Sequence, residues 1–325
     1  MAEDIGALIE AVRAHPGVQA KADIGLVREV FGEGDWLEGP GDDGAIVMHE
    51  ERALVVGGEA ILPGFVAADP YGAGVAAVST NLNDLAAMGA WPLALVDTVT
   101  GPRPVVRRVL EGMRWAAALY DVPVVGGHLT ATAGPPSLSA FGLGRADRPL
   151  SARAAAPGQS LVFAACLDGR MREDFPFFPS FEERGDRLAG DVRLLAEGAS
   201  AGWAAAAKDV SMAGLVGSLA MLLECNRLGA TLDLDALPVP PRVTLRQWLT
   251  CFPCFAFLLC VPAGAETECL HAFAGRGLAA AVAGSLDATG ELRLRRAGQE
   301  GVAFDLARET VTGLAVPATA RRGPA

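Results

Sequence analysis

The sequence predicts an α+β protein with two domains. The chain has 325 residues, of which 51% are hydrophobic, and a domain typically takes about 100–200 residues. Apolar runs of strand length occur together with longer segments of helical periodicity in both halves, and helices are segregated from short strands. A stretch rich in proline and small residues, Arg145–Gln159, separates the halves. The predicted domains are therefore residues 1–150 and 151–325.

The first half begins with a mixed lead-in of short helices over residues 1–38. Two short apolar runs at 45–47 and 53–56 flank a charged turn, which predicts a hairpin. Residues 73–88 carry apolar side chains at helical spacing and predict a helix. The elements expected next are a strand at 93–99, a helix at 105–120, and strands at 122–125 and 138–143.

The second half mixes both element types in the same way. It opens with a strand at 161–165, and a loop rich in Phe and Pro follows at 175–181. A strand near 204–207 leads into a long apolar helix at 215–228. The other expected elements are helices at 190–199 and 268–274 and strands at 231–234, 256–261, 278–283 and 291–295.

Composition excludes several classes of function. The net charge of −11 disfavours nucleic acid as a partner, because nucleic-acid binding relies on basic patches. No apolar run reaches the ~18–20 residues of a membrane-spanning helix, and the best candidate, Cys251–Val261, is interrupted by Pro253. The N-terminus, Met1–Asp4, lacks the basic start of a signal peptide. We therefore expect a cytoplasmic protein that binds neither nucleic acid nor a membrane.

The cysteines and lysines give weaker indications. All six cysteines lie in the second half, mostly in apolar stretches, so we expect buried free thiols. Cys251 and Cys254 form a lone CxxC pair, and no second pair completes a zinc site. Lys21 and Lys208 are the only lysines in a chain rich in arginine. They either remain by chance or occupy places that require a compact ammonium group.

Three familiar motifs do not fit this chain. The run Gly39–Gly44 matches GxGxxG, but it precedes a strand and carries two carboxylates where a dinucleotide phosphate would lie. The run Gly198–Gly202 matches GxSxG, but it follows a helix rather than a strand. Neither lysine follows a glycine, which excludes a Walker A loop. Any ATP must therefore be bound by another route.

Two segments of the first half carry oxygen ligands suited to a metal. Asp42 and Asp43 stand between glycines, and paired carboxylates suit a hard cation such as magnesium that bridges to phosphates. An ordinary acidic turn has the same composition. Asn81 and Asp84 are three residues apart on the predicted helix, so they share one face beside the apolar stripe. An ordinary helix with a polar face would show the same spacing.

Two further segments have features of a phosphate or ligand site. Gly126 and Gly127 follow an apolar strand and precede His128, and glycines let a ligand approach the backbone closely. The alternative is a plain turn between strand and loop. Asp209 and Ser211 stand just before the long apolar helix, whose N-terminus favours anions. The alternative is that one of them simply caps the helix.

In this order and at this spacing, the four segments resemble the PurM-like (AIR synthase-related) superfamily. That superfamily includes AIR synthase, thiamine-monophosphate kinase, selenophosphate synthetase and a hydrogenase-maturation protein. The run from Asn81 to Ala90, NLNDLAAMGA, is its most specific part and is close to the corresponding helix of thiamine-monophosphate kinases. The resemblance covers about residues 40–290, and it is also similar to a branch called AIR synthase-related proteins.

The resemblance implies a fold, cofactors and a site. The N-terminal domain, 1–150, would bind ATP and dimerise through a shared β-barrel, and the C-terminal α/β domain, 151–325, would close the active site. Magnesium on the triphosphate would be held by Asp42, Asp43 and Asp84, with Glu59 as another acidic ligand. The nucleotide would be lined by Asn81, Asp84, Gly126, Gly127 and His128. The residues implied in catalysis or phosphate contact are Asp209, Lys208 and Lys21, and Lys208 either stabilises developing charge or pairs with Asp209.

Departures from the relatives narrow the chemistry. The first cysteine is Cys166 and the last is Cys269, so the reactive cysteines of selenophosphate synthetases and of the hydrogenase-maturation protein have no counterpart. Met212 stands where thiamine-monophosphate kinases carry the second aspartate of their DVSDGL-type motif. We expect an ATP- and magnesium-dependent homodimeric enzyme that phosphorylates or activates a small-molecule acceptor. The alternatives are a thiamine-monophosphate kinase-like enzyme, a nucleotide-binding regulatory or assembly subunit, and a dimeric scaffold without nucleotide.

A basic and aromatic loop in the second half is the candidate contact for the acceptor. It contains Arg170, Arg172, Phe175, Phe177 and Phe178. The alternative is that this loop packs its own aromatic side chains.

Overall fold

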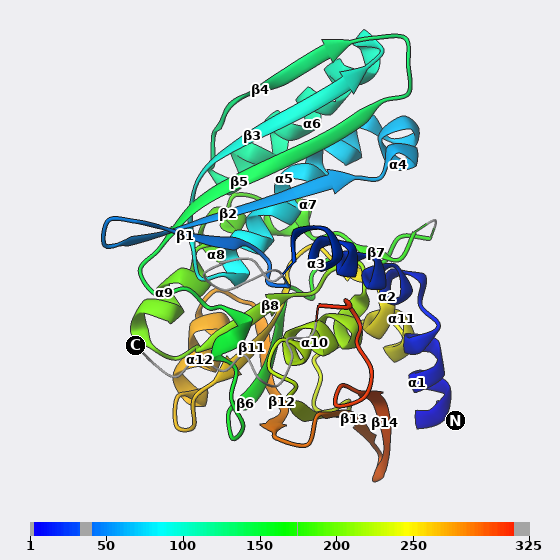
Figure 1. The fold of residues 1–325 in the computed structure, drawn as a ribbon, viewed down its shortest axis with the longest axis vertical. Helices are drawn as coiled ribbons and strands as arrows, with labels where there is room; N and C mark the ends of the chain where they lie inside the picture. Colours follow the sequence, from blue (N-terminus) through cyan, green and yellow to red (C-terminus); the bar gives the residue numbers. More distant parts are fainter. Residues whose placement is uncertain (1–2, 33–40, 174, 315–325) are drawn as a thin grey trace. The chain divides into compact units, whose positions relative to one another are not determined.

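The computed structural model describes residues 3–32, 41–173 and 175–314. The chain divides into two compact units (Figure 1). The first unit comprises residues 43–150 and 181–202, and the second unit comprises residues 1–42, 151–180 and 203–325. The lead-in therefore belongs with the C-terminal sheet, and a segment from the second half returns to the first unit. The division of roles between 1–150 and 151–325 stays a prediction.

The first unit is built on a five-stranded sheet with the order β1-β2-β5-β3-β4. Its neighbouring strands are antiparallel except β3 and β4, which are parallel because helix α6 returns the chain between them. The strands are β1 (Ala45–His49), β2 (Arg52–Ile61), β3 (Trp91–Gly101), β4 (Val124–Ala131) and β5 (Ser137–Ala146).

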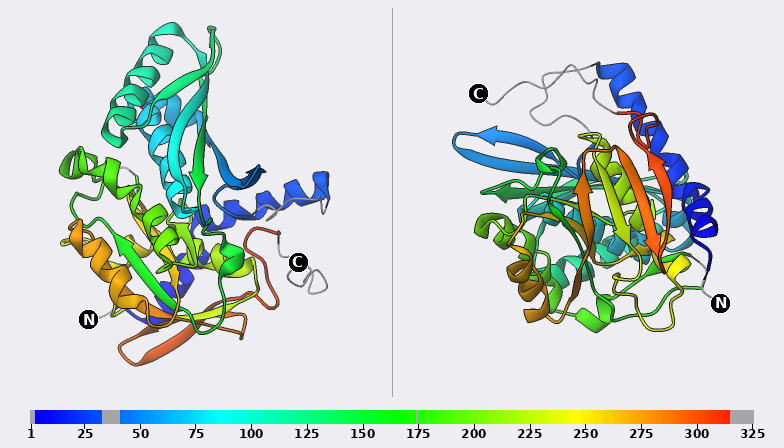
Figure 2. Two further views of the ribbon diagram at one scale, coloured as in Figure 1. Left: turned by 90° about the vertical axis from the view of Figure 1, so that its left-hand side faces the viewer. Right: turned by 90° about the horizontal axis from the view of Figure 1, so that it is seen from below.

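Helices α5 and α6 lie side by side on one face of this sheet (Figures 1 and 2). A Cβ on Gly74 would lie 2.1 Å from the carbonyl oxygen of Val109, and a Cβ on Gly112 would lie 2.1 Å from that of Tyr71. The two glycines therefore let the helix backbones touch. The helices of the first unit are α4 (Pro63–Ala68), α5 (Pro70–Ala87), α6 (Arg103–Tyr120), α7 (Phe181–Arg184), α8 (Arg187–Asp191) and α9 (Leu194–Ala201).

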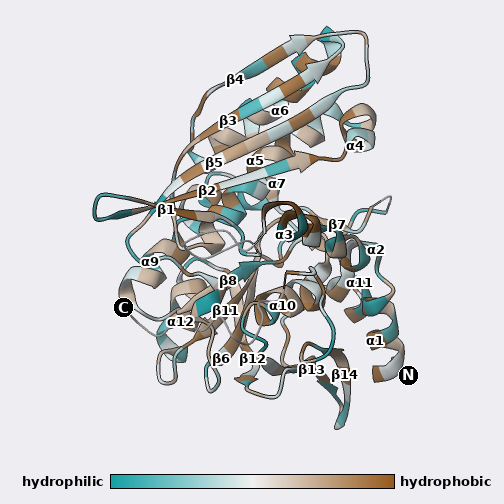
Figure 3. Ribbon diagram, viewed as in Figure 1, coloured by the Kyte–Doolittle hydropathy of each residue, from teal (hydrophilic) through white to brown (hydrophobic). Residues whose placement is uncertain are grey.

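The other face of this sheet is open and apolar. Val56, Val96, Phe141 and Leu143 are each 36–42% exposed, and they alternate along their strands with buried residues that face the helices. Phe141 lies opposite Val96, and Leu143 lies opposite Val56, so the four side chains lie on one face of the sheet. Figure 3 colours hydrophobic stretches of these strands brown. We call these residues the open apolar face.

The second unit is built on a seven-stranded sheet with the order β14-β13-β9-β12-β6-β11-β8, beside a two-stranded pair β7 and β10. The central strands β6 and β11 are almost wholly buried, which explains their continuous apolar sequences. The strands are β6 (Ser160–Ala165), β7 (Phe177–Phe178), β8 (Ala206–Asp209), β9 (Gly229–Asp233), β10 (Phe252–Pro253), β11 (Ala256–Val261), β12 (Ala279–Asp287), β13 (Glu291–Arg296) and β14 (Gln299–Asp305).

The lead-in helices pack on the core of the second unit. Ile5, Leu8 and Val12 of α1 are buried in the same cluster as the apolar side chains of α10. Arg13 binds Glu309 through two hydrogen bonds of 2.8 Å and so fixes the end of α1 near the C-terminal strand β14. The helices of this unit are α1 (Ile5–Arg13), α2 (Pro16–Gln19), η1 (Ala20–Ile24), α3 (Gly25–Phe31), η2 (Ala152–Ala154), α10 (Gly214–Glu224), α11 (Leu245–Thr250) and α12 (Glu266–Gly275).

The α+β class predicted from the sequence is confirmed, and most elements lie within a few residues of their predicted positions. One predicted helix, 190–199, is two helices, because the chain bends between α8 and α9. The glycines at 126 and 127, predicted to begin a loop, lie inside β4. All six cysteines are free thiols, and burial raises the pKa of Cys251 to about 12. None of the helices in the described residues is long and apolar enough to cross a membrane.

Candidate metal and phosphate site

Two carboxylates meet in the first unit at the C-terminal half of α5. Oxygens of Asp43 and Asp84 lie within 4.8 Å of each other, and Asp84 is only 7% exposed. A Cβ on Gly57 would lie 3.4 Å from the carbonyl oxygen of Asp43 and 3.9 Å from the Cβ of Asp84, so strand β2 passes directly beside both acids. Like charges this close repel each other, and a divalent cation bound between them offsets that repulsion.

Asn81 lies one turn before Asp84 and is completely buried. Its side-chain amide donates to the carbonyl oxygens of Ala77, at 2.8 Å, and Ala140, at 3.2 Å. Its Oδ1 atom is buried and accepts no hydrogen bond from any described residue. An unsatisfied buried acceptor costs about 1–3 kcal/mol, so a donor bound at this oxygen would stabilise the site. The carboxylate pair and this free acceptor together fit a hydrated magnesium ion.

A row of residues crosses the sheet beneath the helices. Across the sheet, the row consists of Glu59 on β2, Ala140 on β5, Asp97 on β3 and Gly127 on β4. Each of these residues lies directly opposite the next. These residues share the helix-covered face with the buried residues of their strands. Because Asn81 bonds to the carbonyl oxygen of Ala140, the two carboxylates of the row flank the strand that Asn81 contacts.

Asp97 is the functional candidate that sequence reasoning missed. It is 7% exposed, its carboxyl has no hydrogen bond or ion pair with a described residue, and burial raises the pKa of that carboxyl. Buried acids without partners are costly and concentrate at functional sites. The available signal was a lone aspartate inside an apolar strand. A Cβ on Gly127 would lie 2.4 Å from Asp97 Oδ1, so this glycine leaves the space that the carboxyl occupies.

The other predicted residues of β4 point elsewhere. His128 lies opposite Thr98, which is exposed, and its Nε2 atom is 3.3 Å from the Oγ1 atom of Thr130. Gly126 shares this face, and nothing lies within 4 Å of a Cβ placed there. The structure therefore brings Gly127 to the helix-covered face with Asn81 and Asp84, whereas Gly126 and His128 lie on the opposite face of the same sheet.

In the second unit, Asp209 is the last residue of β8 and lies next to Lys208. Both side chains are buried, and Lys208 Nζ lies 2.5 Å from Asp209 Oδ1. Of the two roles that the sequence left open for Lys208, the structure shows the pairing with Asp209. Such a pair offsets part of the cost of burying the two groups.

The turn after Asp209 is held from three sides. The Ser211 N–H donates to Ser218 Oγ at 3.0 Å. A Cβ on Gly17 would lie 2.0 Å from the carbonyl oxygen of Met212, and a Cβ on Gly214, whose φ is +69°, would lie 2.4 Å from that of Leu249. The N-cap of α10 is Ala213, and no side chain caps the helix. The alternative that Asp209 or Ser211 caps the helix is therefore wrong, and the first amides of α10 carry no side-chain cap.

Two predicted residues occupy peripheral positions within the second unit. Asp42 Oδ2 accepts a hydrogen bond of 2.9 Å from the N–H of Ala152, at the start of η2. Lys21 lies in η1 and is partly exposed. One carboxylate oxygen of Asp42 thus has a structural bond, whereas Asp43, the next residue, belongs to the first unit.

Two aromatic side chains of the proposed acceptor loop pack against other aromatic residues of the second unit. Phe177 stacks on Phe252 with ring centroids 5.4 Å apart, and Phe178 meets Trp248 edge-on at 5.4 Å. Arg172 and Phe175 instead line a small pocket of about 270 Å³ with Gln247 and Thr250. The alternative that aromatic side chains of this loop serve packing therefore applies to Phe177 and Phe178.

Comparison with known proteins identifies the family. Residues 41–146 match the AIR synthase related protein, N-terminal domain, and residues 167–296 match the AIR synthase related protein, C-terminal domain. The chain belongs to the AIR synthase-related family. The superfamily resemblance and the two-domain PurM-like fold are thereby confirmed for this AIR synthase-related protein.

Individual relatives span different shares of this AIR synthase-related protein. An uncharacterised protein of Synechocystis is 31% identical over 91% of this chain and 94% of its own length. The thiamine-monophosphate kinase of Rhodopirellula baltica is 33% identical over 51% of this chain and 50% of its own length. The structure of T. maritima PurL complexed with ATP has a TM-score of 0.70 at 21% identity. That match covers 81% of this chain and 46% of the PurL chain, so this protein spans about half of the solved PurL chain.

Proposed function

We propose that this AIR synthase-related protein is an ATP- and magnesium-dependent enzyme that phosphorylates a small metabolite or activates it by phosphorylation. The observation that carries the proposal is the pair of carboxylates on Asp43 and Asp84, beside the unsatisfied Oδ1 of Asn81. Magnesium takes oxygen ligands and bridges carboxylates to phosphates. Two relatives, a thiamine-monophosphate kinase and a PurL complexed with ATP, support a nucleotide substrate and phosphoryl transfer.

Each residue near the pair has a proposed role. Asp43 and Asp84 hold magnesium, and Asp209 is a further metal or phosphate contact. Asn81 Oδ1 accepts from a metal-bound water or from the nucleotide. Magnesium on the phosphates neutralises the charge that phosphoryl transfer spreads over their oxygens. Lys208 orients the Asp209 carboxylate, in keeping with their 2.5 Å contact.

The remaining predicted residues have outer roles in this proposal. Asp42 and Glu59 supply further negative charge near the metal, and Lys21 reaches the phosphates from the lead-in. Gly127 leaves the space that the Asp97 carboxyl occupies, because a Cβ there would lie 2.4 Å from Asp97 Oδ1. A nucleotide role for Gly126 and His128 requires the ligand to reach the open face of the sheet.

The open apolar face supports the proposed homodimer. Monomeric proteins rarely expose contiguous apolar patches larger than a few hundred Å², and this face continues over three neighbouring strands. A second copy laid on it would form the shared barrel that the family resemblance implies. Phe141→Asp is then expected to give monomers in sedimentation equilibrium. A variant with the same mass as wild type would contradict this interface.

A nucleotide-binding regulatory subunit is the second candidate. Met212 favours it, because this side chain stands where related kinases have an aspartate, and it is 37% exposed beside the α10 N-terminus. A thiamine-monophosphate kinase-like enzyme would have to work without that carboxylate. ATP hydrolysis measured over a panel of small-molecule acceptors, thiamine monophosphate included, separates the three, because only a regulatory subunit binds ATP without any acceptor-dependent turnover.

The deciding experiment is a thermal-shift titration with ATP, with and without magnesium. A ligand that binds only the folded state adds about 2.7 kcal/mol of stability at one hundred times its Kd. We expect a magnesium-dependent shift in wild type that Asp84→Asn abolishes while the variant stays folded. Glu51→Gln, in the exposed turn between β1 and β2, is the matched control and retains the shift. No shift in wild type, or an unchanged shift in Asp84→Asn, contradicts the proposed site.

A further inference from the structure

Three consecutive residues at the C-terminal end of α10 contact three different segments of the second unit. They are Glu224, which is the last residue of the helix, Cys225 and Asn226. The segments they contact are residues 311–314, Gly41 and the helix η2, all of which belong to the second unit. We call Glu224, Cys225 and Asn226 the α10 end. Its contacts converge on the chain that leads into Asp43.

Glu224 binds the segment 311–314 through its carboxylate. This residue is only 2% exposed. Its Oε2 atom accepts hydrogen bonds of 3.0 Å from the backbone N–H groups of Val311 and Thr312. Its Oε1 atom accepts a bond of 3.2 Å from the Thr312 hydroxyl. A buried acid is costly without such partners, so the bonds compensate its burial and fix residues 311 and 312 against the helix.

Thr312 connects this anchor to Gly41 through Leu314. The Thr312 hydroxyl accepts a bond of 3.2 Å from the N–H of Leu314. A Cβ on Gly41 would lie 3.5 Å from Leu314 Cδ1 and 3.7 Å from Cys225 Sγ, which are ordinary van der Waals distances. The φ of Gly41 is +112°, a conformation that favours glycine. The chain therefore bends at Gly41 while it packs against Leu314 and Cys225.

Asn226 supports the next residue of the same chain, Asp42. Its Nδ2 atom lies 2.9–3.2 Å from three backbone carbonyl oxygens in and just after η2. The N–H of Ala152, the first residue of η2, donates to Asp42 Oδ2 at 2.9 Å. Gly41 and Asp42 are thus held by groups that the α10 end keeps in place.

We propose that Glu224 and Asn226 are positioning residues for the magnesium site, because they fix the chain immediately before Asp43. This inference rests on the proposed function. Asp43 follows Asp42 directly, so the peptide bond between them joins the held segment to the metal ligand. Contacts behind the ligands of a metal orient those ligands, and losing one typically costs about 10–100-fold in metal affinity. Glu224 and Asn226 act through Gly41 and Asp42 and do not touch the ion.

The test measures the magnesium concentration at which ATP gives half of its maximal thermal shift, with the full-length protein. Glu224→Gln and Thr312→Val each remove a bond between the α10 end and residues 311–314, and Asn226→Ala removes the support of η2. We expect each change to raise the half-maximal magnesium concentration about tenfold. Thr312→Ser keeps the hydroxyl and is expected to retain the wild-type value.

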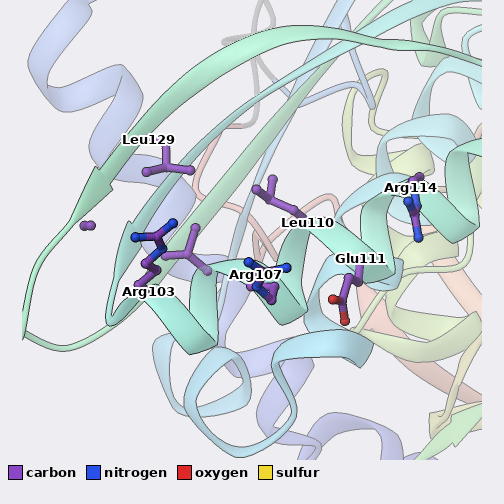
Figure 4. Close-up of a pocket in the computed structure, with 8 residues that line it drawn as sticks. Arg103, Arg107, Leu110, Glu111, Arg114 and Leu129 are labelled. Carbon is purple, nitrogen blue, oxygen red and sulfur yellow. The ribbon is translucent and has the colours of Figure 1, made fainter.

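Two control variants separate positioning from general stability and charge. Glu309→Gln is the matched control, because it removes an acid of the same type that binds Arg13 rather than the segment 311–314. We expect it to lower the urea midpoint without changing the half-maximal magnesium concentration. Arg107→Ala changes the net charge in a groove along α6 (Figure 4), and it is also expected to keep the wild-type magnesium value.

The possible failures of this test have different meanings. No magnesium-dependent shift in wild type overturns the proposed function, and this inference with it. A wild-type shift together with an unchanged magnesium value in Thr312→Val or Asn226→Ala overturns the inference alone, even where the urea midpoint falls, because the α10 end would then be only a structural anchor. An equal rise in Glu309→Gln also overturns it. If Glu224→Gln does not fold, Thr312→Val decides, since it removes one hydroxyl and keeps the carboxylate.

Discussion

Replacing Gly127 by alanine tests whether the space above Asp97 is as tight as the geometry indicates. The new Cβ would lie 2.4 Å from Asp97 Oδ1 and 2.7 Å from the Asp97 carbonyl oxygen, where ordinary contacts begin at 3.4 Å. Either the side chain or strand β3 must move by about an ångström, and overpacking of this kind costs about 1–3 kcal/mol. Gly126→Ala is the matched control, since nothing lies within 4 Å of a Cβ there.

Alanine at position 126 and alanine at position 127 are expected to change the free energy of unfolding in opposite directions. Alanine at 126 lowers the entropy of the unfolded chain and is expected to stabilise the fold by about 0.4–1 kcal/mol. Alanine at 127 lowers the entropy of the unfolded chain in the same way, but its Cβ also clashes with Asp97. The free energies of unfolding of the two variants should therefore differ by about 1–3 kcal/mol. Urea unfolding followed by circular dichroism measures both. Asp97→Ala in the Gly127→Ala background should recover part of the loss, because it removes Oδ1 but leaves the carbonyl contact.

The reasoning fails if the two alanine variants have the same urea midpoint and slope. Equal stability would mean that β3 and β4 give way without cost, and that Asp97 is not held in a fixed place. Destabilisation of Gly127→Ala with no recovery in the double variant would assign the clash to the backbone alone. In that case the carboxyl would not be what requires a glycine at 127.

Three further changes probe pH dependence and the α10 turn. Burial raises the pKa of Asp97 in the fold. The stability that this carboxyl contributes is therefore fully present below its unfolded pKa and is lost as pH rises through its folded pKa. Urea midpoints measured from pH 4 to 8 should show this decline in wild type, and Asp97→Asn should flatten it. The hydrogen bond from Arg13 holds the pKa of Glu309 below its usual range. The stabilisation by this pair is therefore present above the unfolded pKa of Glu309 and is lost as pH falls through the folded pKa. Glu309→Gln should lower the free energy of unfolding at pH 7 but leave it close to the wild-type value at pH 3. Gly17→Ala would bring a Cβ to 2.0 Å from the Met212 carbonyl oxygen and should lower the urea midpoint by the equivalent of about 1–3 kcal/mol, whereas Gly64→Ala, with nothing within 4 Å, should not.

Local pattern was sufficient to predict much of the fold. The hairpin of β1 and β2 follows from two apolar runs around a charged turn, and α5 follows from its helical spacing. Asn81 and Asp84 were predicted on one helix from their spacing, and the family resemblance implied that Asp43 and Asp84 lie together. None of these inferences needs knowledge of how strands pair.

The remainder depended on strand register and long-range packing. Asp97 becomes a candidate only when β3 is aligned with β4 and β5, which places it over Gly127 on the helix-covered face. The same register turns His128 to the other face, because neighbouring residues of a strand point to opposite sides. The association of the lead-in with the second unit depends on contacts such as Arg13 with Glu309, which are 296 residues apart. No local pattern contains that information.

The contact between α5 and α6 makes these two helices a single mechanical body. Because the backbones touch at Gly74 and Gly112, neither helix can slide or tilt without carrying the other, and no side chains lie between them there to absorb the motion. Asp84 is on α5, so the position of this carboxylate depends on how the two helix backbones meet. We expect a larger residue at Gly74 or Gly112 to push the helices apart and to displace Asp84 with them.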